Sequence, residues 1–219
     1  MSRRSGPTAG ASLPYSAAAR RLADIGRRFY ARGWMLGTSG NLSAVVARDP
    51  LKLAITRSSV PKGALTPADV LEVNADGAAT RRGPGRPSAE TQLHCVIARD
   101  RGAGAVLHTH SVWSTILSER HANDGGLTIA GYEMLKGLAG VTSHEQREFV
   151  PILDNDQDMT RLGRRVSAVL DEHHGAHALL LRRHGLYTWG ETLDDAERHV
   201  EIVEFLLEVI GREHHGATV

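Results

Sequence analysis

Residues 104–111 read GAVLHTHS, a short apolar run that ends in a His-x-His pair. The run from Gly104 to His108 predicts a buried strand. On an extended segment, residues two apart point to the same side, so the imidazoles of His108 and His110 can reach one metal ion. The plainer interpretation is a polar strand end, because an isolated pair of this kind is weak evidence for a metal site.

Helical and extended patterns alternate on both sides of this predicted strand. Apolar residues recur at helical spacing from Tyr15 to Gly33, and again after Thr192, which forms a capping-box pattern with Asp195. Further helices are predicted over 88–101, with Ser88 as the cap, and over 112–119 and 157–173. Strands are predicted over 42–46, 51–56, 70–73, 149–153, 178–181 and 186–189. The pattern favours a mixed α/β sandwich, and no Gly-x-Gly-x-x-Gly fingerprint supports a Rossmann fold.

Length and composition exclude several classes of protein. The 219 residues predict one domain over 15–219, preceded by a Ser/Gly/Ala/Pro-rich tail, 1–14, that we expect to be disordered rather than a secretory signal. Lys+Arg 26 against Asp+Glu 25 indicates no nucleic-acid partner, and no apolar run is long enough for a membrane helix. The single cysteine, Cys95, excludes a disulfide framework and fits a reducing, cytoplasmic location.

A third histidine follows another apolar run. His184 lies just after residues 178–181, again where a strand is predicted to end. Three histidines with an open fourth position are typical of catalytic zinc, which polarises a carbonyl or stabilises an enolate. The residues alone leave open whether His184 reaches His108 or is an ordinary core histidine.

Small and hydroxylated residues at three places suggest an anion site. They occur in Gly37–Asn41, at Ser58 and Ser59, and at Ser88. Backbone N–H groups and hydroxyls at such turns and helix starts bind phosphate, although each alone is more often just a turn. No Walker lysine pattern accompanies them, which disfavours a nucleoside triphosphate.

Two glutamates are candidates for proton transfer. Glu90 lies near the start of a predicted helix, and Glu133 lies between Tyr132 and the apolar pair Met134-Leu135. A partly buried carboxyl group has a raised pKa and becomes a usable acid or base, but a capping or surface role explains either residue equally well. His94, four residues after Glu90, is expected to form a helical ion pair with it.

Several of these motifs, taken together and in order from about residue 15 to 211, resemble the class II aldolase/epimerase family. The shared stretches are Gly37–Asn41, Arg86–Thr91, His108–Ser111 and Arg183–Gly185. Three more resemble the methylthioribulose-1-phosphate dehydratase branch of that family: Glu133–Gly137, Pro151–Asp158 and His184–Gly190.

This resemblance implies a three-layer α/β/α domain of class II aldolase type with a central mixed or antiparallel sheet. It implies one Zn²⁺ per subunit on His108, His110 and His184, and a homotetramer with active sites between subunits. Glu133 is the implied acid–base, with Glu90 behind the metal or facing the substrate. The implied phosphate-binding residues are Asn41, Ser58, Ser59 and Ser88, although many relatives carry glycine where this chain has Ser59.

The implied reaction is dehydration of 5-methylthioribulose 1-phosphate to 5-methylthio-2,3-dioxopentyl phosphate, a step of methionine salvage. Zinc would stabilise negative charge on the ketose oxygens, and no nucleotide or redox cofactor is needed. One alternative is a class II sugar-phosphate aldolase or pentulose-phosphate 4-epimerase with the same fold and metal. Another is a non-catalytic oligomeric scaffold that keeps the fold without the chemistry.

Overall fold

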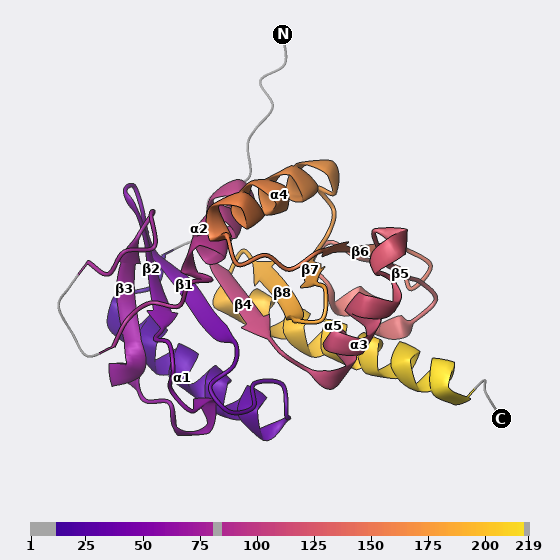
Figure 1. Ribbon diagram of the computed structural model, residues 1–219, viewed down its shortest axis with the longest axis horizontal. Helices are drawn as coiled ribbons and strands as arrows, with labels where there is room; N and C mark the ends of the chain where they lie inside the picture. The colour runs from indigo at the N-terminus through magenta and orange to yellow at the C-terminus, as the bar shows by residue number, and fades with distance from the viewer. Residues whose placement is uncertain (1–11, 81–84, 217–219) are drawn as a thin grey trace, which may run out of the picture.

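The computed structural model describes residues 12–80 and 85–216, which build an eight-stranded sheet flanked by helices (Figure 1). The strand order is β3-β2-β1-β4-β8-β7-β6-β5, antiparallel throughout except for the parallel pair β6 and β7. The strands are β1 Asn41–Arg48, β2 Leu51–Thr56, β3 Val70–Asn74, β4 Ala105–Thr109, β5 Gly126–Ile129, β6 Glu148–Leu153, β7 Ala178–Leu181 and β8 Gly185–Gly190.

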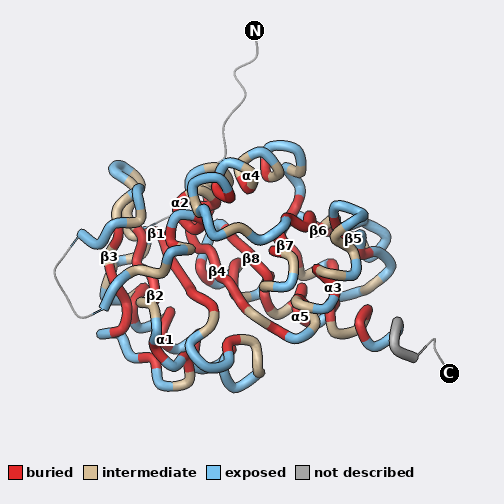
Figure 2. The backbone as a smooth tube through the Cα atoms, in the orientation of Figure 1, coloured by how far each residue is buried: buried red, intermediate tan, exposed pale blue. Residues whose placement is uncertain are grey.

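Helices cover both faces of the sheet. The α-helices are α1 Tyr15–Ala31, α2 Thr91–Asp100, α3 Val112–Arg120, α4 Met159–Glu172 and α5 Leu193–Gly216. Short 3-10 turns occupy Lys62–Ala64, Pro67–Asp69, Ala122–Asp124 and Glu133–Gly137. Helices α2 and α4 pack on one face, whereas α1, α3 and α5 pack on the other, so the red, buried backbone of Figure 2 runs through the strands between them.

The alternation of side chains along each strand produces these two faces. In β7, Leu179 and Leu181 join the core beneath α2 and α4, while Ala178 and Leu180 join the core beneath α3 and α5. Because both faces are covered, all four residues are apolar and buried. The structure confirms the predicted α/β/α class with a mixed sheet.

The predicted elements differ from the structure in two places. Helix α2 begins at Thr91, so Ser88 is not its cap; the Ser88 hydroxyl instead accepts from the Glu90 N–H at 3.3 Å. Strand β5 was not predicted, since its four residues follow a glycine-containing loop and show too short a pattern to separate from that loop. The predicted capping box at Thr192 is confirmed by reciprocal bonds of 3.1 Å between Thr192 and Asp195.

The ends of the domain are only partly described. Residues 1–11 of the predicted tail lie outside the described ranges, whereas Leu13 packs against the core beside α1. Among the helices of 12–80 and 85–216, none combines the length and apolar character that a membrane crossing demands.

The core predicts a test of the fold. Leu53 in β2 is 0% exposed, whereas Leu36, in the loop after α1, is 57% exposed. Leu53→Ala leaves a cavity and is expected to lower the free energy of unfolding by about 2–5 kcal/mol, while Leu36→Ala changes it by less than about 0.5 kcal/mol. Urea unfolding at one fixed protein concentration measures both, and equal losses would contradict this account of the core.

Candidate metal centre and adjoining cleft

Three histidines and one glutamate converge at one end of the central strands. His108 is the penultimate residue of the buried strand β4, His110 lies two residues further on, and His184 follows β7. One ligand atom each from Glu90, His108, His110 and His184 lies within 4.8 Å of all the others. This group has the composition and spacing to hold a metal ion, and the sequence pattern pointed to all four residues without showing that they meet.

Strand pairing brings His184 to the His-x-His pair. Strand β8 pairs with β4 on one side and with β7 on the other, so the turn between β7 and β8 lies beside the end of β4. Arg183 adopts φ 55° in that turn. Gly185 follows at a position where a Cβ would lie 2.1 Å from the Thr109 carbonyl oxygen, so only glycine fits there.

The protein holds the His108 ring in one orientation. The Nδ1–H donates to the Leu186 carbonyl at 2.9 Å, and the ring stacks on Tyr187 at a centroid distance of 3.9 Å. A carbonyl oxygen only accepts, so Nδ1 is the donor in this bond and Nε2 is the nitrogen that faces the cluster. That nitrogen lies 2.8 Å from His110 Nε2.

Glu90 supplies the negative charge of the cluster. One carboxylate oxygen lies 3.0 Å from His184 Nε2 and 3.5 Å from His108 Nε2, and the other accepts from the Asn41 amide at 2.6 Å. Burial by itself would raise the pKa of Glu90, but the neighbouring imidazoles outweigh it and hold that pKa well below its usual range. Glu90 is therefore an anion, suited to charge balance beside a cation rather than to proton donation.

A buried chain of polar side chains orients Glu90 from behind. The Asn41 amide group donates to Glu90, its oxygen accepts from His94 Nε2, and His94 Nδ1 lies 2.7 Å from the Ser43 hydroxyl. Burial lowers the pKa of His94 to about 3, so the ring is neutral. The expected ion pair between Glu90 and His94 is wrong, because the helix begins after Glu90 and the ring turns inward to Asn41 instead.

The donor set fits a divalent metal ion. His108 presents Nε2 to the cluster, and burial lowers the pKa of His110 to about 3. Nε2 of His184 lies 3.0 Å from the Glu90 carboxylate, and its Nδ1 is buried without a hydrogen-bond partner among the described residues. Three imidazoles and one carboxylate match the nitrogen and oxygen ligands that zinc and related cations prefer.

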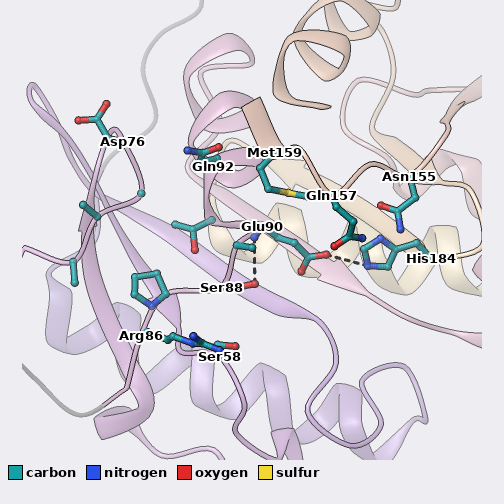
Figure 3. Close-up of a pocket in the computed structure, with 16 residues that line it drawn as sticks. Ser58, Asp76, Arg86, Ser88, Glu90, Gln92, Asn155, Gln157, Met159 and His184 are labelled. Carbon is teal, nitrogen blue, oxygen red and sulfur yellow. Dashed lines mark hydrogen bonds and ion pairs between the residues drawn. The ribbon is translucent and has the colours of Figure 1, made fainter. Parts of the chain in front are cut away.

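A cleft of about 940 Å³ opens from this cluster (Figure 3). Glu90 and His184 form its floor, with Ser88 beside Glu90 and with Ser58 and Arg86 lying together at one side. Asn155, Gln157 and Met159 line the side nearer His184. Arg86 was not predicted as a site residue, although it begins the Arg86–Thr91 stretch that resembles the family. It adds a guanidinium to the predicted anion-binding hydroxyls.

The remaining predicted phosphate residues occupy different environments. Ser59 is exposed and adopts φ 62°, a left-handed conformation that favours glycine, which accounts for the glycine expected there in relatives. Its hydroxyl lies 3.3 Å from that of Ser58. Asn41 is 4% exposed and its amide donates to Glu90 and Ser88, so in this structure it contacts the cluster directly, and its contact with phosphate stays a prediction.

A buried lysine joins the Gly37–Asn41 loop to the loop that carries Ser58. Lys62 is 1% exposed, and its ammonium group donates to the carbonyls of Thr38 at 3.0 Å and Val60 at 3.1 Å. Burial lowers its pKa to about 8, with the charge of Glu90 opposing the shift. The sequence showed no pattern that separates this lysine from a surface one.

Glu133 lies outside the cluster. It begins the 3-10 turn Glu133–Gly137, its side chain is 73% exposed, and its carboxylate accepts from Lys136 at 2.7 Å. The bond to Lys136 lowers the pKa of Glu133. Within one chain, the structure therefore does not bring Glu133 together with the other predicted site residues, and its catalytic role stays a prediction.

Comparison with known proteins places the chain in a family. The profile described as the Class II Aldolase and Adducin N-terminal domain matches residues 20–210, and the chain belongs to this family. It is 44% identical over 195 residues to the methylthioribulose-1-phosphate dehydratase of Sorangium cellulosum, covering 89% of this chain and 91% of that one. It is 47% identical over 190 residues to the protein of the same name from Acidiphilium cryptum, covering 86% and 87%.

Solved structures share the same fold. YgbL from Escherichia coli superposes with a TM-score of 0.71 at 26% identity, covering 90% of this chain and 89% of that one. L-fuculose-1-phosphate aldolase from Thermus thermophilus superposes with a TM-score of 0.69 at 23% identity, covering 94% and 97%. This second likeness concerns the fold alone.

The geometry of the cluster predicts how metal content responds to substitution. His110→Ala removes one of three imidazole nitrogens and is expected to reduce bound divalent metal from about one ion per chain to a small fraction of that value. The matched control His174→Ala changes an exposed histidine and is expected to retain the metal. Elemental analysis of purified protein after dialysis measures both, and equal retention would refute the four-residue centre.

Proposed function

We propose that this protein is a zinc-dependent methylthioribulose-1-phosphate dehydratase of the methionine salvage pathway. The observation that carries the proposal is the convergence of His108, His110, His184 and Glu90 at one cluster, of which Glu90 and His184 line the adjoining cleft. The printed names of relatives above 40% identity over most of the chain support the choice of reaction.

The three imidazoles would hold the ion, with Glu90 beside them balancing its charge. Bound zinc supplies a Lewis acid that stabilises negative charge on the ketose oxygens. Asn41 keeps the Glu90 carboxylate directed at the cluster, and Leu186 and Tyr187 keep the His108 ring in place. These contacts set the site before substrate binds, which lowers the reorganisation needed during the reaction.

The substrate phosphate is assigned to the side of the cleft that contains Ser58, Arg86 and Ser88. Two hydroxyls and a guanidinium there offer hydrogen-bond donors to phosphate oxygens. With the carbonyl and C3 hydroxyl of the ketose at the cluster, the chain beyond C3 extends toward the opposite side of the cleft. Ser59 and Asn41, whose side chains contact Ser58 and Ser88 respectively, are assigned to the same phosphate site.

The dehydration needs an acid–base group. The C3 proton is removed, the C4–O bond breaks, and the departing hydroxyl takes up a proton to leave as water. The resulting enol, with its double bond between C3 and C4, then takes up a proton at C4 and loses the proton of its C3 hydroxyl to give the 2,3-diketone. Glu90 is held as an anion by the imidazoles, so it is a poor proton donor, and we assign the acid–base role to Glu133.

Glu133 can fill this role in the cleft of a neighbouring subunit. It is exposed in the isolated chain and lies outside the cluster of that chain. Burial against a second copy would raise its pKa toward the range of an effective acid. A homotetramer with cytoplasmic location and active sites between subunits is therefore part of the proposal, and the buried, unpaired Cys95 fits a reducing compartment.

The direct test is turnover of 5-methylthioribulose 1-phosphate. Metal-loaded protein is expected to produce a diketone detected by ultraviolet absorption, chelation is expected to abolish the signal, and added zinc to restore it. Release of dihydroxyacetone phosphate would show an aldolase instead. Absence of turnover by protein that contains stoichiometric metal would refute the dehydratase assignment.

A second test concerns Glu133. Glu133→Gln keeps the shape of the side chain but cannot exchange a proton at that position, and kcat is expected to fall by about 100-fold or more. Glu145→Gln, at an exposed position in the following loop, is the matched control and is expected to retain activity. Metal content is measured in both, and near-normal kcat in Glu133→Gln would overturn its assignment as the acid–base.

A further inference from the structure

Two histidines form hydrogen bonds with the backbone N–H and carbonyl groups of Ala139, close to the turn that carries Glu133. Ala139 lies two residues after the end of the turn Glu133–Gly137. Its N–H donates to His199 Nε2 at 3.1 Å, and its carbonyl accepts from His177 Nε2 at 2.8 Å. His199 lies on α5 and His177 immediately precedes β7, so the two rings reach Ala139 from different elements. We call this pair of rings the Ala139 clamp.

The partners of His199 define it as a neutral ring. Its Nδ1 lies 2.7 Å from the Trp189 carbonyl, which only accepts, so Nδ1 carries the proton. Its Nε2 accepts from the Ala139 N–H and therefore carries none. His199 is 2% exposed, and burial lowers its pKa to about 4, in agreement with this protonation state.

The partners of His177 define it as a protonated ring. Its Nδ1 lies 3.0 Å from a carboxylate oxygen of Glu148, and its Nε2 faces the Ala139 carbonyl, so both nitrogens donate. Glu148 is 5% exposed, and its second oxygen accepts from the His177 backbone N–H at 2.9 Å. Burial lowers the pKa of His177, but the bond and charge of Glu148 outweigh burial and the opposing charge of Arg101, so the pKa is raised.

Other contacts hold the same segment by its backbone and apolar side chains. The Gly137 carbonyl accepts from Arg198 Nε at 2.8 Å, and a Cβ on Gly137 would lie 2.5 Å from the Ile202 side chain. Leu135 is 0% exposed. A turn of five residues makes few internal hydrogen bonds, so these external contacts determine its orientation.

We propose that His177 and His199 are positioning residues for the Glu133 carboxylate. The inference rests on the proposed function in so far as Glu133 is the acid–base. Neither ring touches the substrate cleft; each acts through the Ala139 backbone, which orients the turn from which Glu133 projects. Small displacements of a proton-transfer group reduce the rate strongly, so an exposed carboxylate needs an anchored backbone.

The protonation of His177 makes the clamp sensitive to alkaline pH. A neutral ring has one N–H and can donate to Glu148 or to Ala139, but not to both. Because the folded-state pKa is raised, the stabilising contribution is present at low pH and is lost as pH rises through that pKa. The charged or titratable groups that face the ring are Glu148, His199 and Arg101.

The test compares His199→Leu with His199→Gln, using full-length metal-loaded protein. Leu removes the acceptor for the Ala139 N–H, whereas Gln offers an amide oxygen in its place. His199→Leu is expected to lower kcat about tenfold or more with KM within about twofold, and metal content unchanged. His199→Gln is expected to recover most of the loss, and His174→Leu, at an exposed histidine, is the matched control.

Amide hydrogen exchange reports on the clamp without substrate. Exchange over residues 133–141 is expected to be faster in His199→Leu, with the sheet unchanged. In the unmodified protein, protection there is expected to decline at alkaline pH after correction for the intrinsic rate, and His177→Gln is expected to remove that dependence. Faster exchange throughout the molecule, or local loosening with unchanged kcat, would overturn the proposal. Full activity of Glu133→Gln would instead overturn the assignment of Glu133 as the acid–base. The two failures are distinguishable, because the exchange measurement tests the clamp without using the activity of Glu133.

Discussion

The pairing of β8 with both β4 and β7 is the constraint on which the site depends. It places the turn that carries His184 beside the end of β4, where His108 and His110 lie. His184 is more than 70 positions away from His108 and His110 along the chain, and the backbone pairing of the strands brings it to them. The apolar cores on both faces of the sheet stabilise this pairing, so the geometry of the cluster is held by the bulk of the domain.

The site places a carboxylate and three imidazoles in a largely buried position. The charge and hydrogen bonds of His108 and His184 outweigh burial and hold the pKa of Glu90 well below its usual range, whereas burial lowers the pKa of His110 to about 3. The Ser43–His94–Asn41 chain then directs Glu90 without adding net charge. Such an arrangement can balance the charge of a divalent cation. Because Glu90 is a poor proton donor, we propose that proton donation falls to Glu133.

The Glu133 turn and the cluster are built in opposite ways. The cluster consists of side chains held by the sheet, whereas the turn is exposed at its carboxylate and is anchored through the backbone near it and through the buried Leu135 side chain. An exposed functional group on a short turn depends on its anchors for precision. In the Ala139 clamp, two histidines in different protonation states anchor the backbone beside this turn. The hydrogen-bond donors and acceptors that each ring faces define its protonation state.

Local sequence patterns were enough to predict most of the elements, because an apolar run such as residues 178–181 and a capping pair such as Thr192 and Asp195 encode their own structure. They also identified the histidines and glutamates that bear the chemistry, since residue type determines which ligands and charges are available. The start of α2 and strand β5 were not predicted correctly, because their boundaries depend on long-range packing.

Only the tertiary structure decided which of these residues meet. It brought His184 to His108, turned His94 toward Asn41 instead of Glu90, and kept Glu133 apart from the cluster within one chain. Proximity between distant residues follows from strand order and register, which no local pattern specifies.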